Sequence, residues 1–184
     1  MSRCHPARPV LVLLLLGAAL SPGAGGLHAA DAKPKAPPCA SEEYHQFDFW
    51  IGEWEVWTDR IREAGGPPVH SRVSRIADGC ALLEEYNAPW GYQGRSLTYF
   101  DRAAGVWRQT WVDSTATPSR QSGGLIGTSM VFQREAEDGL LHEMRWKPRS
   151  DGTIQQTWRV THDGGKTWTI RFDGTYRPIR TGGS

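Results

Sequence analysis

Polar side chains that alternate with tryptophan along two segments are the residues of this chain that could do chemistry. Gln109 and Asp113 have the same parity as Trp111. Gln156 has the same parity as Trp158 in a later segment. Successive side chains of a strand point to opposite faces, so each set would share one face. Polar groups on an inward face either satisfy one another or bind a molecule, and we take these residues as candidate ligand contacts.

Carboxylates on such a face could also serve as general bases. Asp113 and Glu84 are the candidates for this role. Glu84 adjoins Glu85, and neighbours in a strand point to opposite faces, so the two cannot act together as a dyad. Arg145, on a nearby segment, is a further candidate charged contact whose face the sequence leaves open. No residue is assigned a catalytic role.

Standard catalytic and metal motifs are absent from the sequence. It contains no G-x-S-x-G, G-x-x-x-x-G-K or G-x-G-x-x-G, and therefore predicts no standard hydrolase, phosphate-loop or dinucleotide site. The histidines are scattered, without H-x-H or H-E-x-x-H spacing, so no metal site is predicted.

The segment from Thr161 to Trp168, THDGGKTW, fits the Asp-box pattern of sialidase-type propellers. In that pattern the Asp163 carboxylate would accept backbone N–H groups, Gly165 would take a strained turn position and Trp168 would pack beneath. Propellers carry several copies, whereas this chain has one and is too short for six blades. We therefore interpret the motif as a structural hairpin and not as a glycosidase signature.

Alternating segments bounded by turn residues fill most of the chain. They span residues 53–60, 69–77, 80–88, 94–101, 105–113, 119–126, 128–136, 139–148, 153–162 and 166–177. Turn residues such as Asp151-Gly152 separate them, so neighbours should be antiparallel. One face is apolar throughout, and in the last segment it carries Trp168, Ile170, Phe172 and Tyr176. The pattern predicts an all-β, up-and-down antiparallel barrel of about ten strands.

An aromatic cluster precedes the first strand. Glu42 to Trp50 is predicted to be a helix of about two turns with Ser41 as its N-cap. Gly52 and Trp54 then open the first strand, in a Gly-x-Trp step that resembles the one in lipocalin-like barrels. We expect this helix, with Trp50, to plug one mouth of the barrel.

The N-terminal region has the features of a secretory signal peptide, which we assign to residues 1–30 with cleavage near Ala30. Arg3 and Arg8 precede an apolar run, and small residues follow it. We expect a Pro/Lys/Ala-rich tether at 31–43, a single barrel domain at 44–178, a flexible tail at 179–184, and a periplasmic or extracellular location. No membrane span is predicted in the mature protein.

The charge of the chain is nearly balanced, with 21 Lys plus Arg against 20 Asp plus Glu. Without Arg3 and Arg8 the totals become 19 and 20, and no basic run remains, so no nucleic-acid partner is predicted. The oligomeric state stays open.

Cys4 leaves with the signal, so the exported protein keeps Cys39 and Cys80. An even pair in an oxidising compartment favours a disulfide, with two unpaired thiols as the alternative.

Five phrases of the sequence resemble a domain family of unknown function found in exported bacterial proteins. They are QFDFWIGEW at 46–54, DGCALLE at 78–84, YQGRSLTYFD at 92–101, WRQTWVD at 107–113 and DGGKTW at 163–168. The resemblance implies a calycin-like barrel, related in architecture to lipocalins and nitrobindins. It implies no established activity.

Nitrobindins bind haem through a histidine on a late strand, so haem is the cofactor to weigh. The last segment here has no histidine, and the first strand lacks the Gly-x-Trp-x-Gly-x-Gly pattern. His142 and His162 are substitutes that nothing in their spacing supports, and we predict no cofactor.

Three functions remain open. The preferred one is a non-catalytic exported barrel that holds a small, partly apolar molecule between Trp111 and Trp158. The alternatives are an enzyme using an interior carboxylate, and a solid-core interaction module acting through loops such as the one at Trp90. These functions differ in whether the barrel interior is hollow or filled. The sequence does not distinguish a hollow from a filled barrel, because side chains alternate in the same way in both.

Overall fold

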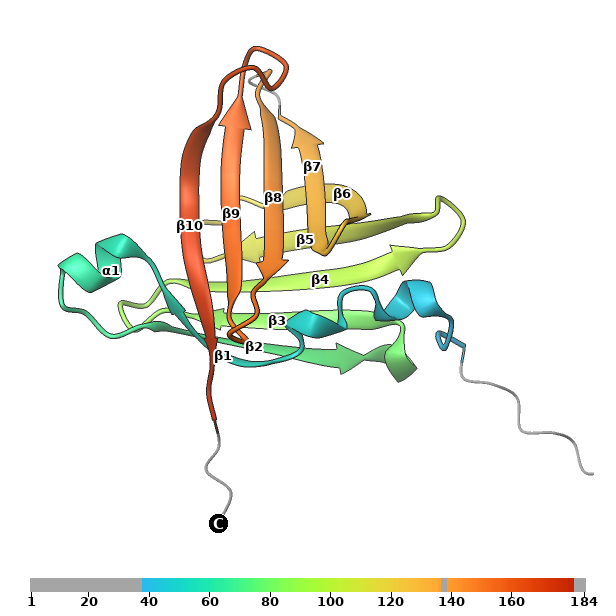
Figure 1. The fold of residues 1–184 in the computed structure, drawn as a ribbon, viewed down its shortest axis with the longest axis horizontal. Coiled ribbons are helices and arrows are strands. Elements are labelled where there is room, and N and C mark those ends of the chain that lie inside the picture. The colour runs from blue at the N-terminus through green and yellow to red at the C-terminus, as the bar shows by residue number, and fades with distance from the viewer. Residues whose placement is uncertain (1–37, 137–138, 181–184) are drawn as a thin grey trace, which may run out of the picture. The chain divides into compact units, whose positions relative to one another are not determined.

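The computed structural model describes residues 38–136 and 139–180, which form a closed barrel of ten antiparallel strands (Figure 1). The strands follow one another in chain order, and the first pairs with the last. They are β1 (Gly52–Trp57), β2 (Val69–Ile76), β3 (Ala81–Asn87), β4 (Gln93–Asp101), β5 (Val106–Asp113), β6 (Ser119–Ile126), β7 (Ser129–Glu135), β8 (Leu141–Pro148), β9 (Ile154–Thr161) and β10 (Thr169–Pro178). The predicted all-β up-and-down barrel is confirmed.

Tight turns set this topology. In the β8–β9 turn, Gly152 has a φ of 81°, and the Asp151 carboxylate accepts the backbone N–H of Thr153 at 2.9 Å. Such turns force neighbouring strands to be antiparallel, and pairing of β1 with β10 leaves no free edge in the described sheet. No helix in the described part of the chain is long and apolar enough to cross a membrane.

The plug before β1 is present, but it is not the predicted α-helix. Two short 3₁₀ helices, η1 (Glu42–His45) and η2 (Asp48–Trp50), replace it, with Phe47 between them outside helical geometry. Tyr44, Phe47 and Trp50 are buried and lie three residues apart. Three residues is the repeat of a 3₁₀ helix, and all three rings are buried although helical geometry is interrupted at Phe47.

Phe47 is the centre of the closed end of the barrel. Its ring stacks on Trp50 at 4.8 Å between centroids. It also meets the rings of Trp107, Phe132 and Trp146, from β5, β7 and β8, at 5.4 to 6.0 Å. Edge-to-face packing of this kind adds to the area that these large rings bury. The aromatic cluster therefore fills the barrel at this end.

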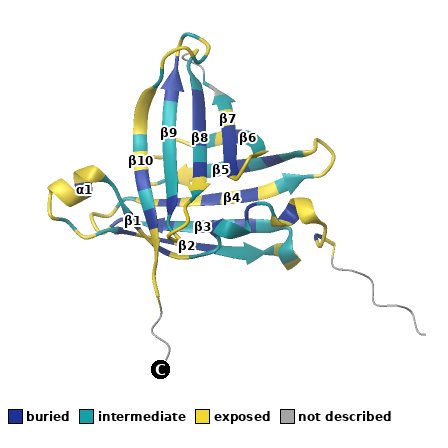
Figure 2. Cartoon of the chain, viewed as in Figure 1, coloured by how far each residue is buried: buried dark blue, intermediate teal, exposed yellow. Residues whose placement is uncertain are grey.

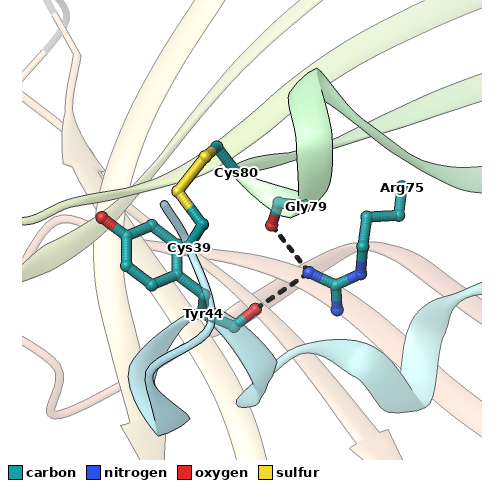
Figure 3. Close-up of a disulfide and its surroundings, with 5 residues drawn as sticks. All are labelled: Cys39, Tyr44, Arg75, Gly79 and Cys80. Carbon is teal, nitrogen blue, oxygen red and sulfur yellow. Dashed lines mark hydrogen bonds between the residues drawn. A yellow bond between two sulfur atoms is a disulfide. The ribbon is translucent and has the colours of Figure 1, made fainter. Parts of the chain in front are cut away.

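A disulfide and an arginine attach the plug to the sheet (Figure 3). Cys39 and Cys80 are bonded, as predicted, with their Cα atoms 5.1 Å apart. Beside them, Arg75 Nη1 donates to the carbonyl oxygens of Tyr44 at 3.3 Å and Gly79 at 2.8 Å. The guanidinium also forms an ion pair with Asp48 in η2. The plug is thus held by covalent, ionic and apolar contacts together.

The first predicted strand segment, 53–60, extends too far. β1 ends at Trp57, and α1 (Asp59–Glu63) follows. Thr58 caps this helix, since its Oγ1 accepts the backbone N–H of Ile61 at 3.2 Å. Ile61 is the buried residue of this helix. The N-cap at Thr58 starts a helix, although the alternation of apolar and polar residues in the sequence continues past Trp57.

The predicted inner face of the last strand is wrong at its first two positions. Ile170 is 55% exposed, because a β-bulge shifts the register between Ile170 and Phe172. Trp168 lies under the Arg159 guanidinium, 4.1 Å from its ring centroid, and donates from Nε1 to Gly165 O. From Phe172 to Tyr176 the strand has the predicted facing, and Figure 2 shows β10 exposed next to the β9–β10 turn, buried further along and exposed again at its end.

Asp163 holds the β9–β10 turn together. Its Oδ1 accepts the backbone N–H of Thr167 at 2.9 Å and the hydroxyl of Thr161 at 2.7 Å. These hydrogen bonds keep the pKa of Asp163 well below its usual range. The carboxylate is committed to the turn.

The Cys39–Cys80 bond should contribute strongly to stability. It closes a loop with a sequence separation of 41 residues, and removing it by the double change Cys39→Ser and Cys80→Ser should lower the free energy of unfolding by roughly 4 kcal/mol. Urea denaturation with and without dithiothreitol would measure this. Reductant should destabilise the wild type and leave the double variant unchanged; a wild type indifferent to reductant would contradict the assignment.

Candidate functional site

The barrel is hollow beyond the aromatic plug. A cavity of about 1140 Å³ extends from the interior to an open mouth beside α1, the loop of residues 88–92 and the loop of residues 114–118. The residues of the plug do not line it, whereas Trp90, which is 61% exposed, lies at its mouth. A space of this size can enclose a small organic molecule.

The structure brings most of the candidate residues to this cavity. Those that line it are Gln109, Trp111 and Asp113 of β5, Gln156 and Trp158 of β9, and Glu84 of β3. Their common facing follows from pairing across the sheet and from alternation within each strand.

Arg145 does not belong to this set. It lies between Met144 and Trp146, which line the cavity, and therefore faces the outside of the barrel. There its Nη2 donates to Glu143 Oε1 at 3.3 Å, alongside Arg159 at 2.8 Å. The sequence left its face open because the register of β8 depends on its partners.

Glu84 is the most unusual group in the cavity wall. It is 3% exposed, and its Oε1 and Oε2 accept the hydroxyls of Ser71 and Ser96 at 3.0 and 3.1 Å. The hydroxyl of Tyr176 lies 3.3 Å from Oε1 and 2.6 Å from Gln156 Oε1. Burial raises the pKa of Glu84 to about 7, although these three hydroxyls oppose the shift.

A second group of polar side chains continues from Ser96. Gln109 Nε2 lies 3.1 Å from Thr98 Oγ1 and 3.4 Å from Ser96 Oγ, and its Oε1 accepts from Gln121 Nε2 at 2.6 Å. Gln121 Oε1 is buried and has no hydrogen-bond partner among the described residues. A buried acceptor without a hydrogen bond costs free energy, because it has lost its bonds to water. Since Gln121 lines the cavity, a bound molecule could donate to it.

Several of these residues were not identified from the sequence. Ser71 and Ser96 have the parity of buried neighbours in their strands, so alternation gave a weak signal for them, whereas Gln121 has no buried neighbour in β6. Tyr176 was predicted only as an apolar-face residue, and Tyr86 was not singled out. Ser71, Ser96 and Tyr176 come from three other strands, so their meeting at Glu84 depends on the register between strands.

Asp113 is a structural carboxylate. It receives hydrogen bonds from Thr115, from Trp111 Nε1 at 2.9 Å and from the Tyr92 hydroxyl at 2.9 Å. Partial burial raises its pKa, but the hydrogen bonds outweigh that effect and bring it to about 2. A carboxylate of this acidity is a poor general base, and its role is to orient Trp111 and Tyr92 at the cavity mouth.

Aromatic rings form the wall next to Glu84. Tyr86 meets Trp111 at 5.9 Å and Tyr92 at 6.1 Å between ring centroids, both edge to face. Trp111 lies over Gly94, where a Cβ would be only 2.0 Å from Cζ2 of the indole. Gly94 therefore permits the close approach of Trp111 to β4.

His142 does not present itself as a haem ligand. Its Nδ1 accepts from Trp158 Nε1 at 3.1 Å and lies 3.0 Å from Arg134 Nη2, and its ring stacks on Trp158. It is buried and does not line the cavity, and His162 is exposed at the β9–β10 turn. These contacts do not fit an axial ligand, so we derive no chemistry through haem.

Comparison with known proteins assigns no family. No protein-family profile matches the chain, and no curated protein is significantly similar to it. Within residues 38–136 and 139–180, no group of three or more His, Cys, Asp or Glu side chains is placed to hold a metal ion. The fold and the cavity define the class of this protein as a hollow, closed, ten-stranded antiparallel barrel.

Glu84 should make stability depend on pH. Its pKa in the fold, about 7, lies above its ordinary value of 4.5, so the folded state binds more protons between these limits. Its contribution is complete below the ordinary value and is lost as pH rises through the folded one, a change of about 3 kcal/mol. Glu84→Gln should remove this slope in urea denaturation series from pH 5 to 8.

Glu85→Gln is the matched control, because Glu85 is the next residue, faces outward and is 3.7 Å from Arg95. It should keep the wild-type slope. The Asp113 carboxylate does not interfere, since its lowered pKa affects stability only at more acidic pH. Equal pH profiles for wild type and Glu84→Gln would refute the assignment.

Proposed function

We propose that this protein is an exported, non-catalytic barrel of calycin-like type that binds a small, partly apolar ligand in its interior. The observation that carries the proposal is the cavity of about 1140 Å³, whose wall combines aromatic rings with a buried polar network. Large apolar surfaces with a few fixed polar groups are typical of small-molecule sites.

The composition of the wall indicates the character of the ligand. Trp111, Trp158 and Tyr86 offer flat apolar surfaces, while Glu84, Gln121 and Gln156 offer hydrogen-bonding groups. A ligand that matched both would bury apolar area worth about 25 cal/mol per Å² and would pair polar atoms that now lack protein partners.

Export is part of the proposal. Its support is the basic, apolar and small-residue order of the N-terminal 30 residues, together with the Cys39–Cys80 disulfide, which is stable in oxidising compartments. The cavity argues against the alternative of an interaction module, because that alternative required a solid core. The exposed Trp90 forms part of the cavity mouth.

Filling the cavity should abolish ligand uptake. Gln156 lines the cavity, whereas its neighbour Gln155 bonds Asp173 on the outer face at 3.0 Å. Gln156→Trp should lower the affinity for the apolar fluorophore N-phenyl-1-naphthylamine at least tenfold, and Gln155→Trp should leave it within about twofold of wild type. A titration of fluorophore emission measures both.

Native mass spectrometry of protein purified from its own host complements this titration. A small molecule bound to the wild type and absent from Gln156→Trp would support interior binding. Equal fluorophore affinity in the two tryptophan variants would place the site elsewhere, and a wild type that takes up no fluorophore and carries no small molecule would refute the proposal.

A second candidate function is proton transfer by Glu84. Its pKa near 7 lies at the value that suits a general base or acid, and its carboxylate lines the cavity. Asp113, the other candidate base, is too acidic and too fully hydrogen-bonded for this role.

Deuterium exchange can test proton transfer without a known substrate. Carbonyl-containing small metabolites incubated with protein in D₂O should gain deuterium next to the carbonyl, and Glu84→Gln should slow this gain at least about 100-fold. Glu85→Gln should exchange at the wild-type rate. Exchange no faster than in buffer, or unaffected by Glu84→Gln, would eliminate this candidate.

A further inference from the structure

We propose that the cavity selects ligands carrying a protonated amine, with the ammonium group at Glu84 and the apolar body between the aromatic walls. This inference rests on the proposed function and names its ligand class.

The first observation is that the Glu84 carboxylate lacks a cation. Among the described residues no Lys, Arg or His forms an ion pair with it. Arg95, whose charge acts on it from a distance, lies on the outer face beside Glu85. Buried carboxylates are normally paired, and removal from water penalises the ionised form strongly when they are not.

The second observation is that the protein donors around Glu84 are few. Ser71 and Ser96 donate one proton each. The Tyr176 hydroxyl has a single proton, and its shorter contact is with Gln156 Oε1 at 2.6 Å. An ionised carboxylate can accept about four hydrogen bonds, so Glu84 keeps capacity for a further donor. Since Glu84 lines the cavity, a bound molecule can supply one.

The third observation is the set of aromatic rings that line the cavity together with the Glu84 carboxylate. Tyr86 is two residues along the same strand face, Tyr176 approaches Glu84 from β10, and Trp111 and Tyr92 both contact Tyr86. Ring faces attract ammonium groups within about 6 Å, the more so when water is excluded. Carboxylate and rings together therefore favour an organic cation over a neutral or anionic group.

Other occupants fit less well. A divalent metal ion would need several ligands, and Glu84 belongs to no group of three or more His, Cys, Asp or Glu side chains among the described residues that could hold one. An anion at this position would meet the Glu84 charge directly. The neighbouring phenols, Tyr86 and Tyr176, have pKa values raised by burial and stay neutral at physiological pH.

Three probes with one apolar body separate the head groups: 2-(1-naphthyl)ethylamine, 2-(1-naphthyl)ethanol and 1-naphthylacetate. Fluorescence titration of wild-type protein at pH 8 should give an affinity for the amine at least tenfold above that for the alcohol, and weakest binding for the acetate. At pH 5, where Glu84 is protonated, the preference for the amine should fall at least tenfold.

Glu84→Gln should remove the preference at pH 8, and Glu85→Gln should retain it. Comparison of head groups in the wild type keeps the test decisive even if Glu84→Gln folds poorly. Alcohol or acetate binding as tightly as the amine would overturn the inference while leaving an interior ligand site intact. Failure of all three probes would also overturn it, and the N-phenyl-1-naphthylamine titration would then decide separately whether the cavity binds anything.

Discussion

The width of a closed sheet is fixed by the number of its strands, and the rest of this structure follows from that constraint. Eight strands enclose a space that side chains can just fill, whereas ten enclose more. The interior volume that the side chains of the strands do not fill is occupied at one end of the barrel and left open at the other. Phe47 and Trp50 enter one end and complete an aromatic cluster with Trp107, Phe132 and Trp146. Within residues 38–136 and 139–180, no comparable aromatic segment fills the other end, where the cavity remains.

Pairing between strands assembles the polar part of this cavity. Glu84 of β3 lies directly opposite Ser96 of β4, and Tyr86 lies opposite Ser71 of β2. Neighbouring inward positions on three strands thus bring two hydroxyls to one carboxylate, and Tyr176 reaches it from β10. A one-residue slip of β3 would bury Glu85 in place of Glu84 and expose the apolar positions beside it. The register of β3 therefore fixes both core packing and the site.

Features that act over a few residues were enough to predict the fold. The site depends on contacts between segments that are distant in the sequence, and these could not be predicted. Alternation and Asp-Gly turns act over a few residues, so they located the strands and put Gln109, Trp111 and Trp158 on one face. The 3₁₀ plug, the bulge at Ile170 and the outward facing of Arg145 arise from packing between distant segments. Glu84 was recognisable as a candidate, but Ser71 and Ser96 were not, because their meeting depends on register between strands.

Glu84 is a buried carboxyl without a cationic partner among the described residues, and burial therefore raises its pKa to about 7, so that the ionised form is disfavoured in the fold. If folding were the only requirement, replacing Glu84 together with Ser71, Ser96 and Tyr176 by well-packed apolar residues would stabilise the barrel. Positions that lower stability in an otherwise consistent fold are where function is expected. A molecule that binds Glu84 in the folded state alone would stabilise the fold by an amount that grows with the logarithm of its concentration divided by its Kd. Binding and folding would then be linked through one carboxylate.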